Sequence, residues 1–145
     1  MRDQAQWPAC RRPLLVRDHE RLEALLTRLL DRLCEGYAGE MRAMWARFEM
    51  RLSAHLGAEE RYLLPLFARV GSEEAAELLT EHAVFRKAME DLGAGVDSHA
   101  VSLDVARGFV GALRAHADRE TKLFYRWAER QVRNRVGARW RASWT

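Results

Sequence analysis

The sequence is poor in the residues that define several classes of protein. It has only two cysteines and three prolines in 145 residues, and two cysteines make neither a disulfide framework nor a zinc motif. No apolar run approaches the roughly 18 residues that a membrane span needs, and residues 1–12 lack the continuous apolar segment of a secretory signal. These absences exclude the secreted, membrane and fibrous classes and predict a cytoplasmic protein.

What the chain does contain is typical of one helical domain. Hydrophobic residues make up 48% and charged residues 31%, which is the balance of a globular protein, and residues 1–145 are expected to form a single domain. The net charge is only +3, but residues 126–141 hold six arginines and one acid, Glu129. We therefore expect a short basic C-terminal tail, residues 132–145, which contains Trp140 and Trp144 and has no predicted secondary structure.

Apolar residues recur at helical spacing in four segments. These segments are residues 14–35, 40–69, 72–92 and 102–131. Pro65 is expected to kink the second segment or to mark its last turn, and Gly93, Gly95 and Asp97 are expected to form a loop. Four long helices with short connections favour an all-α fold, an up-down-up-down four-helix bundle over residues 14–131.

Six polar residues occupy positions where such a bundle normally has leucine, and each helix carries one of the four histidines. They are His19, His55, Glu59, His82, His116 and Glu120. Burying these groups without partners costs on the order of several kcal/mol for each charged group. A metal ion removes that cost because it bonds to imidazole and carboxylate together. The six residues also lie at similar distances from the predicted turns, so they are expected to converge within about one helical turn.

The pattern repeats in the two halves of the chain. His55-x-x-x-Glu59 recurs as His116-x-x-x-Glu120, and residues four apart share one face of a helix. Each pair therefore presents an imidazole and a carboxylate to the same metal cluster. Two similar helical hairpins related by a pseudo-twofold axis would place two ions symmetrically, which favours a dinuclear site over a single ion.

Other metal and haem sites fit the sequence less well. The ferritin-type di-iron pattern needs Glu-x-x-His, but the residue three positions before each histidine is Val or Leu. There is no C-x-x-C-H haem attachment, and position 23 is Glu23 where a zincin would need a second histidine after His19. The residue types alone leave the metal open, because the same histidines and glutamates accept zinc or manganese.

Four motifs together point to a known family. They are Asp18-His19, His55-x-x-x-Glu59-Glu60-x-x-Leu63-Leu64-Pro65, Glu81-His82 and His116-x-x-x-Glu120. Over residues 14–131 the chain resembles the hemerythrin-like family, also called HHE cation-binding domains. The resemblance implies a non-haem centre of two iron ions with an oxo or hydroxo bridge, in which Glu59 and Glu120 also bridge the irons. The four bundle histidines would then be terminal ligands.

One departure from the family pattern bears on function. Oxygen-carrying members have a fifth histidine one turn from the histidine of the third helix, where this chain has Leu78 and Arg86. The resemblance therefore implies a protein that binds or reacts with dioxygen, peroxide or nitric oxide, in oxygen or redox sensing or defence rather than in bulk oxygen carriage. The alternative is a metal-dependent regulatory or interaction module that signals iron or redox state through its basic tail. Nucleic acid is not an expected partner.

Four residues near the candidate ligands are expected to lie outside the ligand set or at its edge. Glu23 is expected to be a surface carboxylate paired with an arginine. For Tyr62, a hydrogen bond near the cluster and an ordinary position at the edge of the core both stay open. Asp18 and Glu81 lie about 100° around the helix from their neighbouring histidines, so solvent exposure is expected for both, rather than contact with those histidines.

Overall fold

The computed structural model describes residues 7–35 and 38–142, with side chains for residues 18–35, 39–124 and 127. This part of the chain is helical apart from short turns and contains no strand, which confirms the predicted all-α class. Its elements are α1 (Trp7–Glu35), α2 (Ala38–Ala58), the π-helix η1 (Glu59–Leu63), α3 (Leu64–Phe67), α4 (Ser72–Asp97) and α5 (Leu103–Ala142). None of the described helices combines the length and the hydropathy that crossing a bilayer requires.

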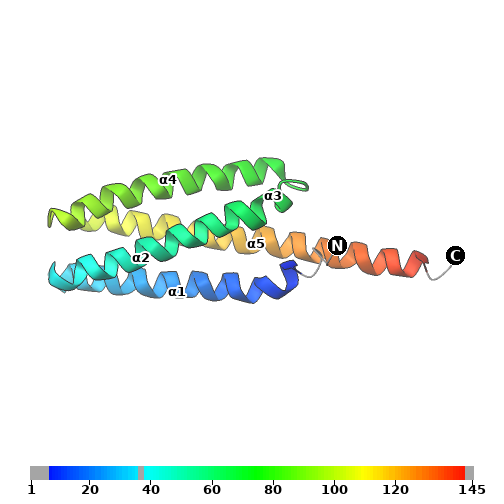
Figure 1. Ribbon diagram of the computed structural model, residues 1–145, viewed down its shortest axis with the longest axis horizontal. Coiled ribbons are helices and arrows are strands. Elements are labelled where there is room, and N and C mark those ends of the chain that lie inside the picture. Colours follow the sequence, from blue (N-terminus) through cyan, green and yellow to red (C-terminus); the bar gives the residue numbers. More distant parts are fainter. Residues whose placement is uncertain (1–6, 36–37, 143–145) are drawn as a thin grey trace.

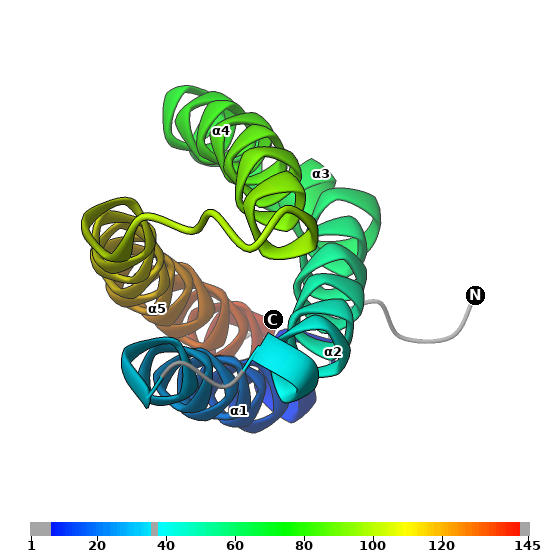
Figure 2. The same ribbon diagram turned by 90° about the vertical axis from the view of Figure 1, so that its left-hand side faces the viewer.

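The long helices lie side by side, and successive ones run in opposite directions along the molecule (Figure 1). α1 packs against α2 and α5, and α4 packs against the same two helices. The view along the helices shows that they surround a common centre (Figure 2). η1 and α3 continue directly from α2, so the second helical segment reaches the turn that precedes α4.

Two apolar clusters fill the interior at different levels along the bundle. The larger cluster includes Phe48, whose side chain is fully buried, and the smaller one includes Phe67. Along α4, Leu78 belongs to the smaller cluster and Phe85 to the larger one, while His82 lies between them in the sequence. A layer of polar residues therefore crosses the bundle between two apolar layers.

The π-helix η1 changes which residues of the second segment face the core. The Leu64 N–H donates to the carbonyl of Glu59, five residues earlier, which is the π-helical pattern. Uninterrupted α-helical spacing predicts Tyr62 on the inner face, but Leu63 and Leu64 are buried instead and Tyr62 is 49% exposed. The wider turn shifts the inner face by one residue. Pro65 follows in α3, the last turn of the segment, as predicted.

The prediction of a loop at Gly93, Gly95 and Asp97 is wrong, because α4 continues to Asp97. A Cβ atom at position 93 would lie 3.0 Å from Trp45 Nε1 on α2. Gly93 therefore permits a close approach between two helices and does not make a turn. The chain turns just after α4, where His99 has a φ of 53°.

The last helix passes through the expected boundary between bundle and tail. α5 runs without a break from Leu103 to Ala142, so residues 132–142, for which the sequence gives no assignment, are helical. Its final part, orange to red in Figure 1, extends past the ends of the other helices. Residues 143–145, which include Trp144, lie outside the described residues.

Candidate metal centre

The six residues that interrupt the apolar stripes lie together in the polar layer. His19 has a side chain that is 14% exposed, and the other five are buried. Their ligand atoms form two groups of four, and within each group these atoms all lie within 4.8 Å of one another. The first group is His19, His55, Glu59 and Glu120, and the second is Glu59, His82, His116 and Glu120. The two carboxylates belong to both groups.

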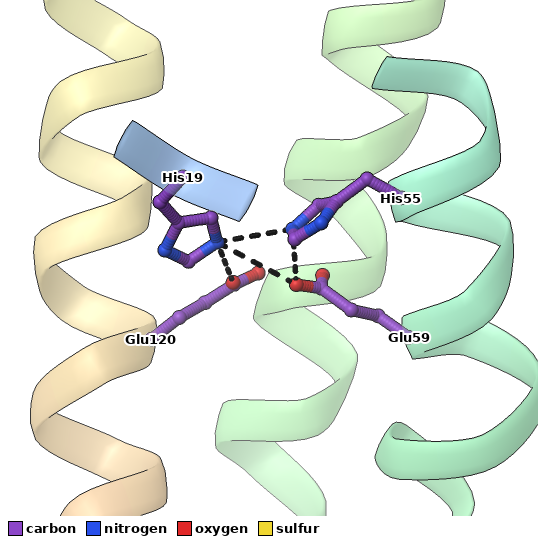
Figure 3. Close-up of side chains that lie close together, drawn as sticks. All are labelled: His19, His55, Glu59 and Glu120. Atoms are coloured by element: carbon purple, nitrogen blue, oxygen red, sulfur yellow. Dashed lines mark hydrogen bonds and ion pairs between the residues drawn. The ribbon is translucent and has the colours of Figure 1, made fainter. Parts of the chain in front are cut away.

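α1 and α2 supply the histidines of the first group (Figure 3). His19 Nε2 lies 3.0 Å from His55 Nε2 and 3.3 Å from Glu120 Oε2. Glu59 Oε1 lies 2.6 Å from His55 Nε2 and 3.8 Å from His19 Nε2. Both imidazoles therefore direct Nε2 toward the same pair of carboxylates.

α4 and α5 supply the histidines of the second group. His82 Nε2 lies 3.1 Å from Glu59 Oε2 and 3.4 Å from Glu120 Oε1, and His116 Nε2 contacts Glu120 Oε1. The ring centroids of His82 and His116 are 5.0 Å apart, close to the 4.7 Å between the two rings of the first group. The two helical hairpins thus place matching histidine pairs against one shared pair of glutamates.

Several of these buried atoms lack the hydrogen bonds that burial normally demands. Both carboxylate oxygens of Glu59, Glu120 Oε2 and His116 Nε2 have no hydrogen-bond partner. Imidazole nitrogens do approach the carboxylate oxygens closely, but the approach lacks hydrogen-bond geometry because the ligand atoms converge on a shared space. A cation bonded to such converging nitrogen and oxygen atoms satisfies them directly. The donor set therefore fits one metal ion in each group.

Both glutamates are charged in the buried layer. Burial opposes ionisation of Glu59, but close contacts with the imidazoles of His19, His55 and His82 outweigh burial and hold the pKa of Glu59 well below its usual value. Burial and the charge of Glu59 both oppose ionisation of Glu120, yet contacts with the surrounding imidazoles still lower its pKa. Both carboxylates therefore offer negatively charged oxygens to a cation.

The pKa values of the facing imidazoles shift in the opposite direction, upward from their usual value. Burial favours neutral His55, but its contacts with Asp18 and Glu59 outweigh burial and raise its pKa to about 10. Burial likewise favours neutral His82, and its contacts with Glu120 and Glu59 raise its pKa to about 9. Without metal, protons on these two histidines balance the charges of the two glutamates.

Three further carboxylates bind the outer nitrogens of the site histidines. Asp18 Oδ2 accepts from His55 Nδ1 at 2.5 Å, and Glu81 Oε2 accepts from His116 Nδ1. The side chains of Asp18 and Glu81 are partly exposed, at 41% and 31%, as predicted. The prediction did not include their contacts with histidines of the next helix, which lie in the direction about 100° away from the neighbouring histidine. Each acid therefore orients the histidine of its partner helix, and such contacts fix the ring and strengthen it as a ligand.

Glu60 is the third outer carboxylate, and its role was not predicted from the sequence. Glu60 Oε1 accepts a hydrogen bond from His82 Nδ1 at 3.0 Å. Arg86 forms a bidentate ion pair with both carboxylate oxygens of Glu60, at 2.5 and 3.0 Å. The hydrogen bonds from Arg86 contribute most to lowering the pKa of Glu60. The signal available in the sequence was an acid directly after a candidate ligand together with an arginine one turn after His82.

Two residues left at the edge of the site can now be placed. Glu23 Oε1 accepts from Arg114 Nε at 2.8 Å, and both side chains are about half exposed, so the predicted surface ion pair is confirmed. Tyr62 is 49% exposed, and its ring centroid lies 5.9 Å from the Arg61 guanidinium carbon. Tyr62 therefore occupies an outer position and not the polar layer.

Metal loading at pH 7 is expected to release at least two protons per chain. His55 and His82 have pKa values of about 10 and about 9, and an imidazole nitrogen must lose its proton before it can bind a metal. Calorimetric titration in buffers of different ionisation enthalpy measures this number, and the apparent affinity should increase as the pH rises from 7 toward 10. Heats that do not depend on the buffer would contradict the expectation.

The comparisons with known proteins agree with this donor set. The family model described as the hemerythrin HHE cation binding domain matches residues 12–128. That range includes all six residues of the two groups and the three outer carboxylates. No curated protein and no solved structure gave a significant match.

Proposed function

Because this chain belongs to the hemerythrin HHE cation-binding domain family, we propose that it is a non-haem di-iron protein that binds or reacts with dioxygen, peroxide or nitric oxide. The observation that carries the proposal is the pair of four-residue groups that share Glu59 and Glu120. In this assignment both glutamates would contribute to holding both ions, and the histidines would each bind one ion. His19 and His55 would hold one ion, and His82 and His116 would hold the other.

Bound iron would supply redox chemistry and open coordination positions for a small oxidant. The chain supplies the geometry for that chemistry. Glu59 and Glu120 hold the two histidine pairs on opposite sides of a shared centre, and the outer carboxylates keep a proton on each Nδ1 that they contact, so that Nε2 is the free ligand atom. The apolar layers on both sides limit the access of water to the site.

The surroundings of His82 support sensing or redox defence over bulk oxygen carriage. Oxygen-carrying members of the family have a fifth histidine one turn away, and this chain has Leu78 and Arg86 at those distances. Leu78 is packed in the smaller apolar cluster, and the Arg86 guanidinium is held by Glu60. Neither residue replaces the missing nitrogen ligand. The site would therefore keep more positions for exogenous ligands than a site with five histidines.

The test is the metal content together with the ultraviolet and visible spectrum, recorded without oxygen and again after exposure to air. The proposal expects two irons per chain, one for each group, and charge-transfer bands that appear on oxidation. Rapid decay of an oxygenated spectrum would agree with sensing or defence, and a persistent one would assign oxygen carriage instead. A colourless protein that contains zinc or no metal after iron-replete expression would contradict the proposal.

A regulatory module is the second candidate, because one helix joins the site to the basic segment. α5 carries His116 and Glu120 and continues without a break to Ala142, and six arginines occur between residues 126 and 141. In this case iron loading should change the rate of tryptic cleavage within residues 126–141. Identical cleavage with and without iron would leave the redox proposal as the only one of the two that stands.

A further inference from the structure

A pocket adjoins the histidines on one side of the polar layer, between α1, α2 and α5. Its volume is about 360 Å³. Three imidazoles line its inner end, those of His19, His55 and His116, while Glu59, His82 and Glu120 do not line it. The pocket therefore reaches the candidate metal centre mainly from the side of the first group, whose His19 is the most exposed of the six candidate ligands.

The walls of this pocket are apolar. They are formed by Leu22, Leu26, Leu52, Leu56, Val110 and Leu113. All but Leu113 are buried, and Leu113 packs against the same apolar cluster. Because these side chains belong to the larger cluster, the pocket cuts into the apolar layer, and it opens to solvent at the exposed side chains of Glu20, Glu23, Arg114 and Asp118.

The volume exceeds what dioxygen, peroxide or nitric oxide requires. One water in the liquid occupies about 30 Å³, and an engineered apolar cavity of about 150 Å³ binds benzene. Pockets that bind small organic molecules begin at about 300 Å³. At about 360 Å³, this pocket falls in the range of an organic ligand larger than benzene.

The charges at the pocket select against ions. Glu20, Glu23, Arg114 and Asp118 line it beside the histidines. Glu23 is paired with Arg114 and Asp118 with Lys122, each at 2.8 Å, and Asp18 and Glu59 balance the charge of His55. The charged groups in these pairs therefore already have partners, and an ion of either sign would lose its hydration among leucine and valine side chains, which is costly.

We propose that this pocket is a binding site for an uncharged, mainly apolar organic molecule that lies against His19, His55 and His116. Such a molecule would cover the side of the candidate metal centre that the pocket reaches, and would thereby control access to the first group. The site rests on the pocket walls and not on the identity of the metal, so it stands or falls separately from the di-iron proposal.

The test uses three probes that share a benzene ring and differ in charge, namely benzyl alcohol, benzoate and benzylamine. Binding to the full chain is measured by proton–nitrogen NMR, with the protein as purified and after loading with diamagnetic zinc. Benzyl alcohol should bind saturably at one site and shift the amide signals of residues beside the pocket. Benzoate and benzylamine should each bind at least about tenfold more weakly.

Two variants that fill the pocket test its location. Leu113→Trp places a larger side chain in the wall, and Val110→Phe does so from a neighbouring position in case the first variant does not fold. Either should weaken binding of benzyl alcohol at least about tenfold. Leu66→Trp is the matched control, because Leu66 is also partly buried but belongs to the smaller cluster, and it should leave binding unchanged.

Three results would overturn the proposal. The first is the absence of saturable benzyl alcohol binding to the folded chain in both metal states. The second is a charged probe that binds as tightly as benzyl alcohol. The third is binding that Leu113→Trp and Val110→Phe leave intact. None of these results depends on the iron content, so failure of the pocket and failure of the di-iron proposal are distinguishable.

Discussion

A chain that carries Glu59→Ala is expected to lose both metal ions and to unfold at a lower temperature than the parent chain. Glu59 belongs to both groups of ligands, and its two oxygens approach different histidines. Oε1 lies 2.6 Å from His55 Nε2, and Oε2 lies 3.1 Å from His82 Nε2. Removing this one carboxylate should therefore take a ligand atom from each ion. Removing one histidine should take a ligand atom from one ion only, because each histidine belongs to a single group.

The same substitution should destabilise the metal-free fold. The pKa of His55 is raised partly by Glu59, to about 10, so the variant leaves a buried imidazolium with one partner fewer. Removing one member of a buried ion pair costs about 3–5 kcal/mol. In the parent chain, protonated His55 and His82 stabilise the metal-free fold through their contacts with carboxylates. This contribution is complete below about pH 6.5 and is lost as the pH rises through about 9 to 10, the pKa values of the two folded-state imidazoles.

Metal content by mass spectrometry and thermal unfolding with and without metal measure both effects. Glu23→Ala is the matched control, because it removes a glutamate that is half exposed and paired with Arg114 outside both groups. It should keep both ions and change the free energy of unfolding by less than about 1 kcal/mol. If Glu59→Ala still held two ions per chain, the bridging role of Glu59 would be wrong.

The second large effect is expected from substitution of the outer carboxylates. Each substitution should weaken the binding of one ion more than the binding of the other. Asp18 binds Nδ1 of His55, a ligand in the first group, and Glu81 binds Nδ1 of His116, a ligand in the second group. Asp18→Asn and Glu81→Gln remove the negative charge and keep the size of the side chain. Loss of such a contact typically lowers metal affinity about 10–100-fold.

Stepwise affinities measured by competition with a chelator, with cobalt(II) as the spectroscopic probe, separate the two ions. Each single variant should weaken one binding step, and the double variant should weaken both. Glu20→Gln is the control, since Glu20 also neighbours His19 but is exposed and does not belong to either ligand group. If Asp18→Asn and Glu20→Gln had the same small effect, the assigned contact would carry no metal affinity.

The helical class was predictable because it depends on spacing along single helices, and the meeting of the six polar residues was predictable because they also lie at similar distances from the predicted turns. His55 and Glu59 are four residues apart and so share a face in any α-helix. The cost of burying them without partners is equally independent of the fold. Periodicity and the chemistry of burial were sufficient to place these residues together.

The features that escaped prediction depend on contacts between helices or on local departures from the α-helix. The direction of Asp18 relative to His19 was anticipated correctly, but the spacing within one helix does not reveal that His55 of the next helix lies there. Tyr62 was placed one residue out of phase, because nothing in the apolar pattern indicates that the turn beginning at Glu59 is a π-turn. Glycine at positions 93 and 95 predicts a turn, and the close approach to Trp45 that accounts for Gly93 exists only in the packed bundle.

The uninterrupted course of α5 has a mechanical consequence. From Glu120 to Ala142 the helix rises about 33 Å at 1.5 Å per residue, and Figure 1 shows that its final part extends past the other helices. A tilt of about 5° at the level of Glu120 would therefore displace the far end by about 3 Å. A rigid helix of this length would act as a lever, with His116 and Glu120 near its pivot and a far end at which small rearrangements among the candidate ligands would be magnified.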